Sequence, residues 1–296
     1  MCIRDSLWIA LGLLGAIALY TALSFVSARA ETRPIKIGSK AFTEQYILAE
    51  MLALRVQEAG LETELLPSLG STFAFEGLAN GDLDAYVDYS GTVWATIMKR
   101  TERPEAREQV LADVKAFLER EHGIGLVARL GFENTYALGM RRAQAQTLGV
   151  ARISDLVRIA PRLEIGGDYE FFDRAEWKAL ESTYGLRFAE QRPMDPSLMY
   201  QAVAEEEVDV ISAFSTDGRI AAFELVLLED DRGVIPPYDA ILLVSARLQQ
   251  EFPQAVEALR RFDGQLDAAA MQRLNHAVDS GEATVSDVAR RALGVD

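Results

Sequence analysis

The side chains that most often perform catalysis or bind transition metals are scarce in this sequence. Its 296 residues include two histidines, His122 and His276, which lie far apart, and one cysteine, Cys2. A serine or cysteine nucleophile needs a nearby base, and a zinc site draws mainly on histidine and cysteine ligands. The residues therefore argue against a nucleophilic enzyme, and we expect no catalytic residue, no metal and no cofactor.

Carboxylates are abundant, but their spacing does not indicate a metal or catalytic site. Asp82, Asp84 and Asp88 alternate along a strand-like run, which we interpret as the solvent-facing edge of a strand. Glu205 and Glu206 lie in a polar run with no base or metal ligand beside them. With 45 acidic against 30 basic residues, the net charge of -15 also excludes the basic surface that a nucleic-acid partner requires.

The first thirty residues have the pattern of an export signal. Residues 7–28 are almost all apolar, and they end in Ala28-Arg29-Ala30, a small-x-small cleavage pattern that a polar stretch follows. We predict a signal peptide over residues 1–30, which makes the mature protein periplasmic. The apolar run is long enough to span a bilayer, so an uncleaved membrane anchor is the alternative.

Strand-like and helix-like segments alternate from Pro34 onward, which predicts an α/β fold of sheets flanked by helices. The predicted strands are 34–38, 64–69, 83–89, 163–166 and 208–211, and the predicted helices are 43–59, 73–79, 104–121, 173–184, one starting at Asp195-Pro196, and most of 249–294. Two long extended stretches, around 130–140 and 234–245, suit paired crossovers between two lobes. We therefore predict a discontinuous first lobe, residues 31–137 plus 240–296, and a second lobe, residues 138–239.

Five short motifs occur in order along the chain. The first, residues 38–45, reads GSKAFTEQ and is similar to the G-S-K-x-F-T-E-Q signature of glycine betaine/choline/carnitine-binding proteins. The other four are Asp88–Thr92, Asn134–Leu138, Phe214–Gly218 and Pro236–Tyr238. With these motifs the chain resembles the ProX/OpuC-like branch of osmoprotectant ABC importers. The resemblance implies a type II periplasmic-binding-protein fold, in which a two-strand hinge joins two α/β lobes around a ligand cleft.

The resemblance also implies a binding site for a quaternary ammonium ligand. The aromatic cage corresponds to Tyr89, Tyr136, Phe214 and Tyr238, and the partners of a ligand carboxylate correspond to Lys40, Thr92 and Arg174. The family usually has tyrosine before S-T-D-G, whereas Phe214 keeps the aromatic face and loses the hydroxyl. We expect Tyr136 and Tyr238 near the hinge, Arg174 and Phe214 on the second lobe, and the other three residues on the first.

These residue types suit a cation that has no N–H to donate. A quaternary ammonium is permanently charged and covered by methyl groups, so an aromatic face offers it both negative electrostatic potential and apolar contact. Arg174 lies at the start of its predicted helix, so its guanidinium and the positive end of the helix would act together on the carboxylate of the ligand.

The resemblance implies the binding subunit of an ABC importer, a monomer that closes on its ligand and delivers it to a permease in the cytoplasmic membrane. Lys40 and Arg174 favour glycine betaine, with choline, carnitine and proline betaine as the other ligands. A sensor or chemotaxis adaptor of the same fold is the alternative function. An enzyme acting in the cleft is a further alternative, against which the scarcity of histidine and cysteine argues.

Overall fold

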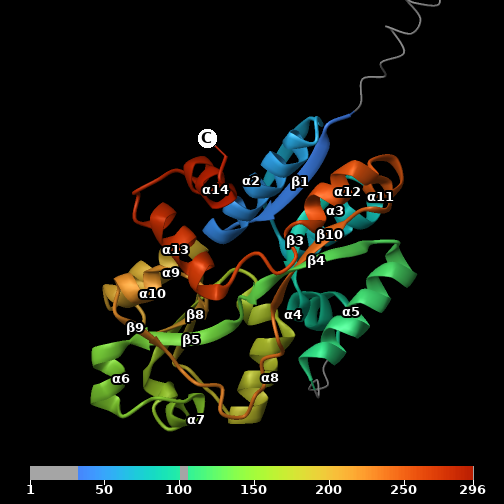
Figure 1. The fold of residues 1–296 in the computed structure, drawn as a ribbon. Helices are drawn as coiled ribbons and strands as arrows, with labels where there is room; N and C mark the ends of the chain where they lie inside the picture. The colour runs from blue at the N-terminus through green and yellow to red at the C-terminus, as the bar shows by residue number, and fades with distance from the viewer. Residues whose placement is uncertain (1–32, 101–105, 296) are drawn as a thin grey trace, which may run out of the picture. The chain divides into compact units, whose positions relative to one another are not determined.

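The computed structural model describes residues 33–100 and 106–295, and the predicted signal peptide or anchor over residues 1–30 lies outside this part of the chain. From Ile35 onward the chain forms two five-stranded sheets with flanking helices (Figure 1). No helix within the described residues is both long and apolar enough to cross a membrane. The alternation of strands and helices that the sequence predicts is thus present in the fold.

The first sheet has the strand order β2-β1-β3-β10-β4. Its strands are β1 (Ile35–Lys40), β2 (Thr63–Leu69), β3 (Ala85–Tyr89), β4 (Gly125–Glu133) and β10 (Asp239–Val244). β1 pairs in parallel with β2 and β3, whereas β10 runs antiparallel to both β3 and β4. A strand from the C-terminal part of the chain therefore completes a sheet that the N-terminal part begins.

Helices cover both faces of the first sheet. The helices of this half are α2 (Thr43–Glu58), α3 (Ser71–Asn80), α4 (Ser90–Thr92), η1 (Val93–Ile97), α5 (Arg107–His122), α11 (Ala246–Glu251), α12 (Pro253–Arg260), α13 (Ala268–Asp279) and α14 (Val285–Leu293). Neighbouring residues of β10 point to opposite faces of the sheet, because Leu242 belongs to the hydrophobic core that includes Leu48 of α2, whereas Leu243 belongs to the core that includes Val110 of α5. The C-terminal α14, red in Figure 1, lies beside α2, which is blue.

The second sheet has the strand order β7-β6-β8-β5-β9. Its strands are β5 (Tyr136–Arg141), β6 (Glu164–Asp168), β7 (Glu190–Met194), β8 (Val210–Phe214) and β9 (Leu225–Leu227). The helices of this half are α6 (Arg142–Leu148), α7 (Ile153–Leu156), η2 (Ala160–Arg162), η3 (Phe171–Asp173), α8 (Ala175–Tyr184), α9 (Pro196–Ala204) and α10 (Arg219–Ala222). β6 is parallel to β7 and β8, and β5 is antiparallel to β8 and β9. Trp177 of α8 and Tyr200 of α9 are buried in the core of this half.

The chain passes from one sheet to the other twice. The first passage is Asn134-Thr135, between β4 and β5, and the second is the segment 228–238, between β9 and β10. The two passages lie side by side, because Asp239 pairs with Glu133 across β10 and β4. Tyr136 pairs within the second sheet, whereas the predicted boundaries place it in the first lobe. Asp239 pairs within the first sheet, whereas those boundaries place it in the second lobe.

The interpretation of the acidic run as a solvent-facing strand edge was wrong for Asp84 and Asp88, and only Asp82 is exposed. β3 lies between β1 and β10, so helices cover both of its faces and all five of its residues are buried. Asp84 is compensated by an ion pair with Arg247 at 2.8 Å. Asp88 is compensated by an ion pair with Lys40. A buried carboxylate requires partners of this kind.

Candidate ligand-binding site

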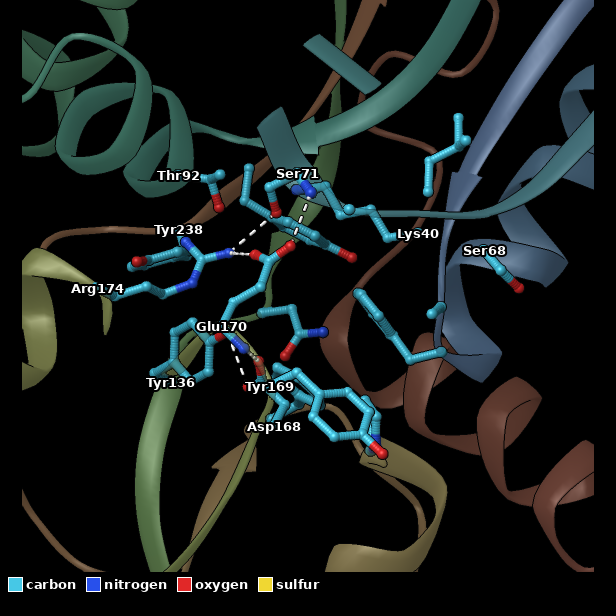
Figure 2. Close-up of a pocket in the computed structure, with 18 of the residues that line it drawn as sticks. Lys40, Ser68, Ser71, Thr92, Tyr136, Asp168, Tyr169, Glu170, Arg174 and Tyr238 are labelled. Atoms are coloured by element: carbon cyan, nitrogen blue, oxygen red, sulfur yellow. Dashed lines mark hydrogen bonds and ion pairs between the residues drawn. The ribbon is translucent and has the colours of Figure 1, made fainter. Parts of the chain in front are cut away.

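One cavity brings together all seven residues that the sequence predicts for ligand binding (Figure 2). Its volume is about 280 Å³. The seven predicted residues among those that line it are Lys40, Tyr89, Thr92, Tyr136, Arg174, Phe214 and Tyr238. They come from both sheets, from neighbouring loops and helices, and from the second passage, because Tyr136 begins β5 and Tyr238 directly precedes β10.

Aromatic rings form a continuous series along this cavity. The rings of Tyr136 and Tyr238 are perpendicular, with their centroids 6.0 Å apart, and the ring of Tyr136 lies 5.4 Å from that of Phe214. Tyr136 and Phe214 are opposite each other in the antiparallel pair of β5 and β8, so the sheet itself brings their rings together. Phe42 stacks on Phe214 at 4.9 Å, and its centroid is 6.3 Å from that of Tyr89. Sequence analysis missed Phe42 as a fifth ring, although it lies in the first motif.

Each of the three tyrosines in this series donates its hydroxyl to a buried carboxylate. Tyr89 donates to Glu44 Oε1 at 2.5 Å, Tyr136 to Asp168 Oδ2 at 2.9 Å, and Tyr238 to Glu176 Oε1. Burial raises the pKa of all three phenols well above the usual value, so the hydroxyls stay protonated and continue to donate. The rings are therefore anchored at their polar ends, which fixes their orientation in the cavity.

Glu44, the glutamate of the GSKAFTEQ motif, connects one of these rings to distant elements. Besides the Tyr89 hydroxyl it accepts hydrogen bonds from Asn134 at 3.0 Å, Thr216 at 2.5 Å and Asn275 at 3.2 Å. Asn134 belongs to the first passage between the sheets, Thr216 follows β8, and Asn275 lies on α13. Desolvation raises the pKa of Glu44, and the four hydrogen bonds act in the opposite direction. The motif glutamate is thus a structural anchor behind the cavity.

Ser90 and Gly91, which follow Tyr89, explain a second motif. The Ser90 hydroxyl donates to the carbonyl of Pro237 at 2.9 Å and accepts from the backbone N–H of Asp239 at 3.0 Å, so it holds the chain on both sides of Tyr238. A Cβ atom on Gly91 would lie 2.5 Å from the Tyr238 ring, which only glycine allows without displacement of the ring.

The two cationic side chains of the cavity are both paired with carboxylates of the protein. Lys40 forms its ion pair with Asp88, and its Nζ lies 5.3 Å from the centroid of the Tyr89 ring. Arg174 Nη2 donates to Glu170 at 2.5 Å, and its Cζ lies 5.2 Å from the centroid of the Tyr136 ring.

Arg174 also connects the two halves of the structure. Its guanidinium donates to the hydroxyl of Ser71 at 2.9 Å and to that of Thr96 at 3.0 Å, and both belong to helices of the first half. The predicted helix start was wrong by two residues, because Asp173 ends η3 and Arg174 is the residue before α8. The backbone at Arg174 is extended, and this directs the chain into α8 at Ala175.

Further polar residues of the cavity, among them Ser71, Asp168 and Glu170, were not predicted from the sequence. The sequence predicts a helix only from Phe73, whereas α3 begins at Ser71, which is close to the cavity. Asp168 and Glu170 follow the predicted strand 163–166 with no motif that indicates a function. Within residues 33–100 and 106–295, no group of three or more histidine, cysteine and carboxylate side chains could hold a metal ion.

Two mixed sheets, a double passage and a cavity lined from both halves define a periplasmic-binding-protein fold. A solved structure described as a glycine betaine/carnitine/choline ABC transporter matches with a TM-score of 0.71 and 28% identity, over 88% of this chain and 97% of that one. The chain belongs to the family described as the substrate binding domain of ABC-type glycine betaine transport systems, which matches residues 33–294. This confirms the predicted family and fold, and the family consists of binding proteins, not enzymes.

Two curated relatives differ in what their names say they bind. The glycine-betaine-binding protein of Pseudomonas aeruginosa is 31% identical over 289 residues, which cover 94% of this chain and 92% of that protein. The ergothioneine transport permease/ergothioneine binding protein EgtU of Helicobacter pylori is 29% identical over 252 residues, which are 84% of this chain. The chain spans only 45% of the length of EgtU.

Gly91→Ala tests the close approach of α4 to Tyr238. The new methyl group would displace the Tyr238 ring, and we expect glycine betaine to bind about tenfold more weakly, a loss equivalent to one or two cation–π contacts. Calorimetric titration measures this effect. Gly77→Ala is the matched control, because its Cβ would lie 3.2 Å from Leu83, a residue that does not line the cavity. Equal affinities of the two variants would contradict the prediction.

Glu44→Gln tests the buried charge behind the cavity. Because desolvation raises the pKa of Glu44 above its ordinary value of 4.5, folded Glu44 holds its proton more tightly than unfolded Glu44. As the pH rises above 4.5, the ordinary pKa, the free energy of unfolding of the native protein should therefore fall relative to that of Glu44→Gln. The difference should level off above the pKa of folded Glu44. Urea denaturation of both proteins between about pH 4 and pH 8 measures this difference, and pH profiles that run parallel would refute it.

Proposed function

We propose that this protein is the extracytoplasmic binding component of an ABC importer for a betaine, a ligand with both a quaternary ammonium and a carboxylate, and that glycine betaine is this ligand. The single observation that carries the proposal is the series of five aromatic rings around one cavity. The partners of the protein are the ligand and, after closure, a permease in the cytoplasmic membrane. The protein acts as a monomer on the periplasmic side.

The aromatic rings supply the cation site. Each cation–π contact contributes about 0.5–2 kcal/mol, with the larger values in desolvated sites such as this one. Four or five contacts of this size sum to about 2–10 kcal/mol before the costs of association, so the carboxylate of the ligand must supply part of the roughly 8 kcal/mol of a micromolar complex. Phe214 offers its face as a tyrosine would, so the missing hydroxyl does not remove a contact with the cation.

Donors at the other end of the cavity supply the carboxylate site. Arg174 is the principal donor, because a guanidinium matches the geometry of a carboxylate and is buried here beside Tyr136. Thr92 and Lys40 line the same cavity, and Ser71 contributes the N-terminal end of α3. Betaines carry both groups that these two ends would bind, whereas choline has only the cation.

The size of the cavity favours a small betaine. Ligand pockets commonly enclose roughly 300–1,000 Å³, and the cavity of about 280 Å³ is at the lower limit of this range. Glycine betaine and proline betaine fit this volume better than ergothioneine, which has the same trimethylammonium and carboxylate groups on a larger frame. Carnitine is the intermediate case.

Closure follows from ligand contacts on two halves. We propose that the two halves are lobes that move about the two passages between the sheets, with boundaries close to those predicted from the sequence. A ligand that contacts Tyr89 and Phe214 at once stabilises the closed arrangement over an open one. The permease would then recognise the closed form.

Tyr238→Leu and Tyr238→Phe separate the aromatic face from the hydroxyl. We expect Tyr238→Leu to weaken the binding of glycine betaine and choline at least about tenfold, because a leucine has no quadrupole to attract the cation. Tyr238→Phe keeps the aromatic face but loses the hydrogen bond to Glu176 that orients the ring, so its affinity should lie between those of the native protein and of Tyr238→Leu. Calorimetry with both ligands measures these changes. A phenylalanine variant as weak as the leucine variant would exclude a cation–π role for this ring.

Arg174→Met tests the carboxylate end of the cavity. A hydrogen bond to a charged partner contributes about 1.5–3 kcal/mol, so we expect glycine betaine to lose about tenfold or more in affinity and choline much less. The comparison of two ligands on one variant cancels any general effect on folding or closure. Equal losses for both ligands would show that Arg174 does not bind the carboxylate.

A further inference from the structure

Glu170 places a carboxylate of the protein beside the donors proposed for the carboxylate of the ligand. Its Oε2 accepts from Arg174 Nη2 at 2.5 Å, and its Oε1 accepts from the backbone N–H of Ser71 at 2.9 Å. The Ser71 hydroxyl accepts from the same guanidinium at 2.9 Å. Figure 2 shows the carboxylate of Glu170 between Arg174 and Ser71, with Tyr136 and Tyr238 nearby.

This arrangement is a carboxylate-binding site in its own right. A buried guanidinium is the preferred partner of a carboxylate, and Ser71 begins α3, a helix of ten residues whose positive end attracts anions. The guanidinium has donor capacity beyond Glu170, because Arg174 Nε is buried and has no hydrogen-bond partner among the described residues. The donors that hold Glu170 are thus the donors that a bound betaine would need.

The two ion pairs of the cavity differ in how readily they can open. In the Lys40–Asp88 pair, the side chains are 7% and 0% exposed, so the carboxylate of Asp88 has no solvent into which it could turn. In the other pair, Glu170 is 39% exposed although Arg174 is only 6% exposed. Glu170 follows the end of β6, so its carboxylate has solvent into which it can turn when the carboxylate of a ligand replaces it on Arg174.

We propose that Glu170 is a specificity-determining residue that competes with the carboxylate of the ligand for Arg174 and Ser71. This inference rests on the proposed function. A betaine must displace Glu170, because two carboxylates on the same donors repel each other. Choline leaves Glu170 in place, and its cation gains a nearby negative charge. Glu170 therefore reduces the preference for betaines over choline that Arg174 creates.

Calorimetric titration of Glu170→Gln with glycine betaine and with choline tests this competition. We expect the dissociation constant of glycine betaine to fall about fivefold or more, because the neutral amide is a weaker partner for Arg174 and no longer repels the ligand. The dissociation constant of choline should stay unchanged or rise. Glu76→Gln is the matched control, because it removes the same charge from an exposed position on α3 and should leave the ratio of the two constants unchanged.

The outcomes separate this inference from the proposed function. If the native protein binds neither ligand, the proposed function is wrong and the role of Glu170 is refuted with it. If the native protein binds both ligands but Glu170→Gln leaves their ratio unchanged, or weakens both equally, only the role of Glu170 is refuted.

Glu170→Asp covers the case in which the glutamine variant does not fold, which thermal unfolding detects. It keeps the charge and shortens the reach to Arg174, so the ratio should shift in the same direction by a smaller factor. An unchanged ratio in this variant would also overturn the proposal.

Discussion

The hydrogen bonds from the cavity tyrosines to buried carboxylates are the interaction on which the rest of the site depends. An aromatic ring binds a cation through its face, so the ring must be held in one orientation, and the hydroxyl is the only polar atom by which it can be held. The carboxylates that accept these bonds are themselves costly to bury. Glu44 shows how the cost is offset, because four donors from different parts of the chain converge on it. The orientation of Tyr89 is thereby linked to the passage between the sheets and to α13.

Charge balance is the second constraint on this cavity. Lys40 and Arg174 each form an ion pair with a carboxylate of the protein, so neither offers an unpaired positive charge to an anion. The Lys40–Asp88 pair is almost wholly buried, whereas Glu170 of the other pair reaches solvent, and we expect this difference to decide which donors a ligand can use. A zwitterionic ligand fits such a balanced site better than a simple anion, since its own two charges replace the interactions that it disturbs.

Predictions from the sequence succeeded where the physical signal is local. GSKAFTEQ and the other motifs place Lys40, Tyr89 and Tyr238 within short segments, and every one of these segments reaches the cavity. Predictions failed where the environment depends on distant strands. The alternation of Asp84 and Asp88 is the pattern of an exposed edge, but β10, some 150 residues later in the chain, covers that edge and buries both groups. Glu170 and Ser71 carry no local pattern at all, because their role arises from the approach of two segments that are 99 residues apart.

The sequence by itself determined the family, because five of its motifs resemble the signature of that family. It also determined the α/β class, because strand-like and helix-like segments alternate along it. Only the tertiary structure decided which of the aromatic and charged side chains are free to meet a ligand. It showed that Phe42 adds a ring, that Lys40 is sealed against Asp88, and that Glu170 contacts the donors proposed for a ligand. Pairing between charges depends on distances through space between remote segments, and no spacing along the chain contains that information.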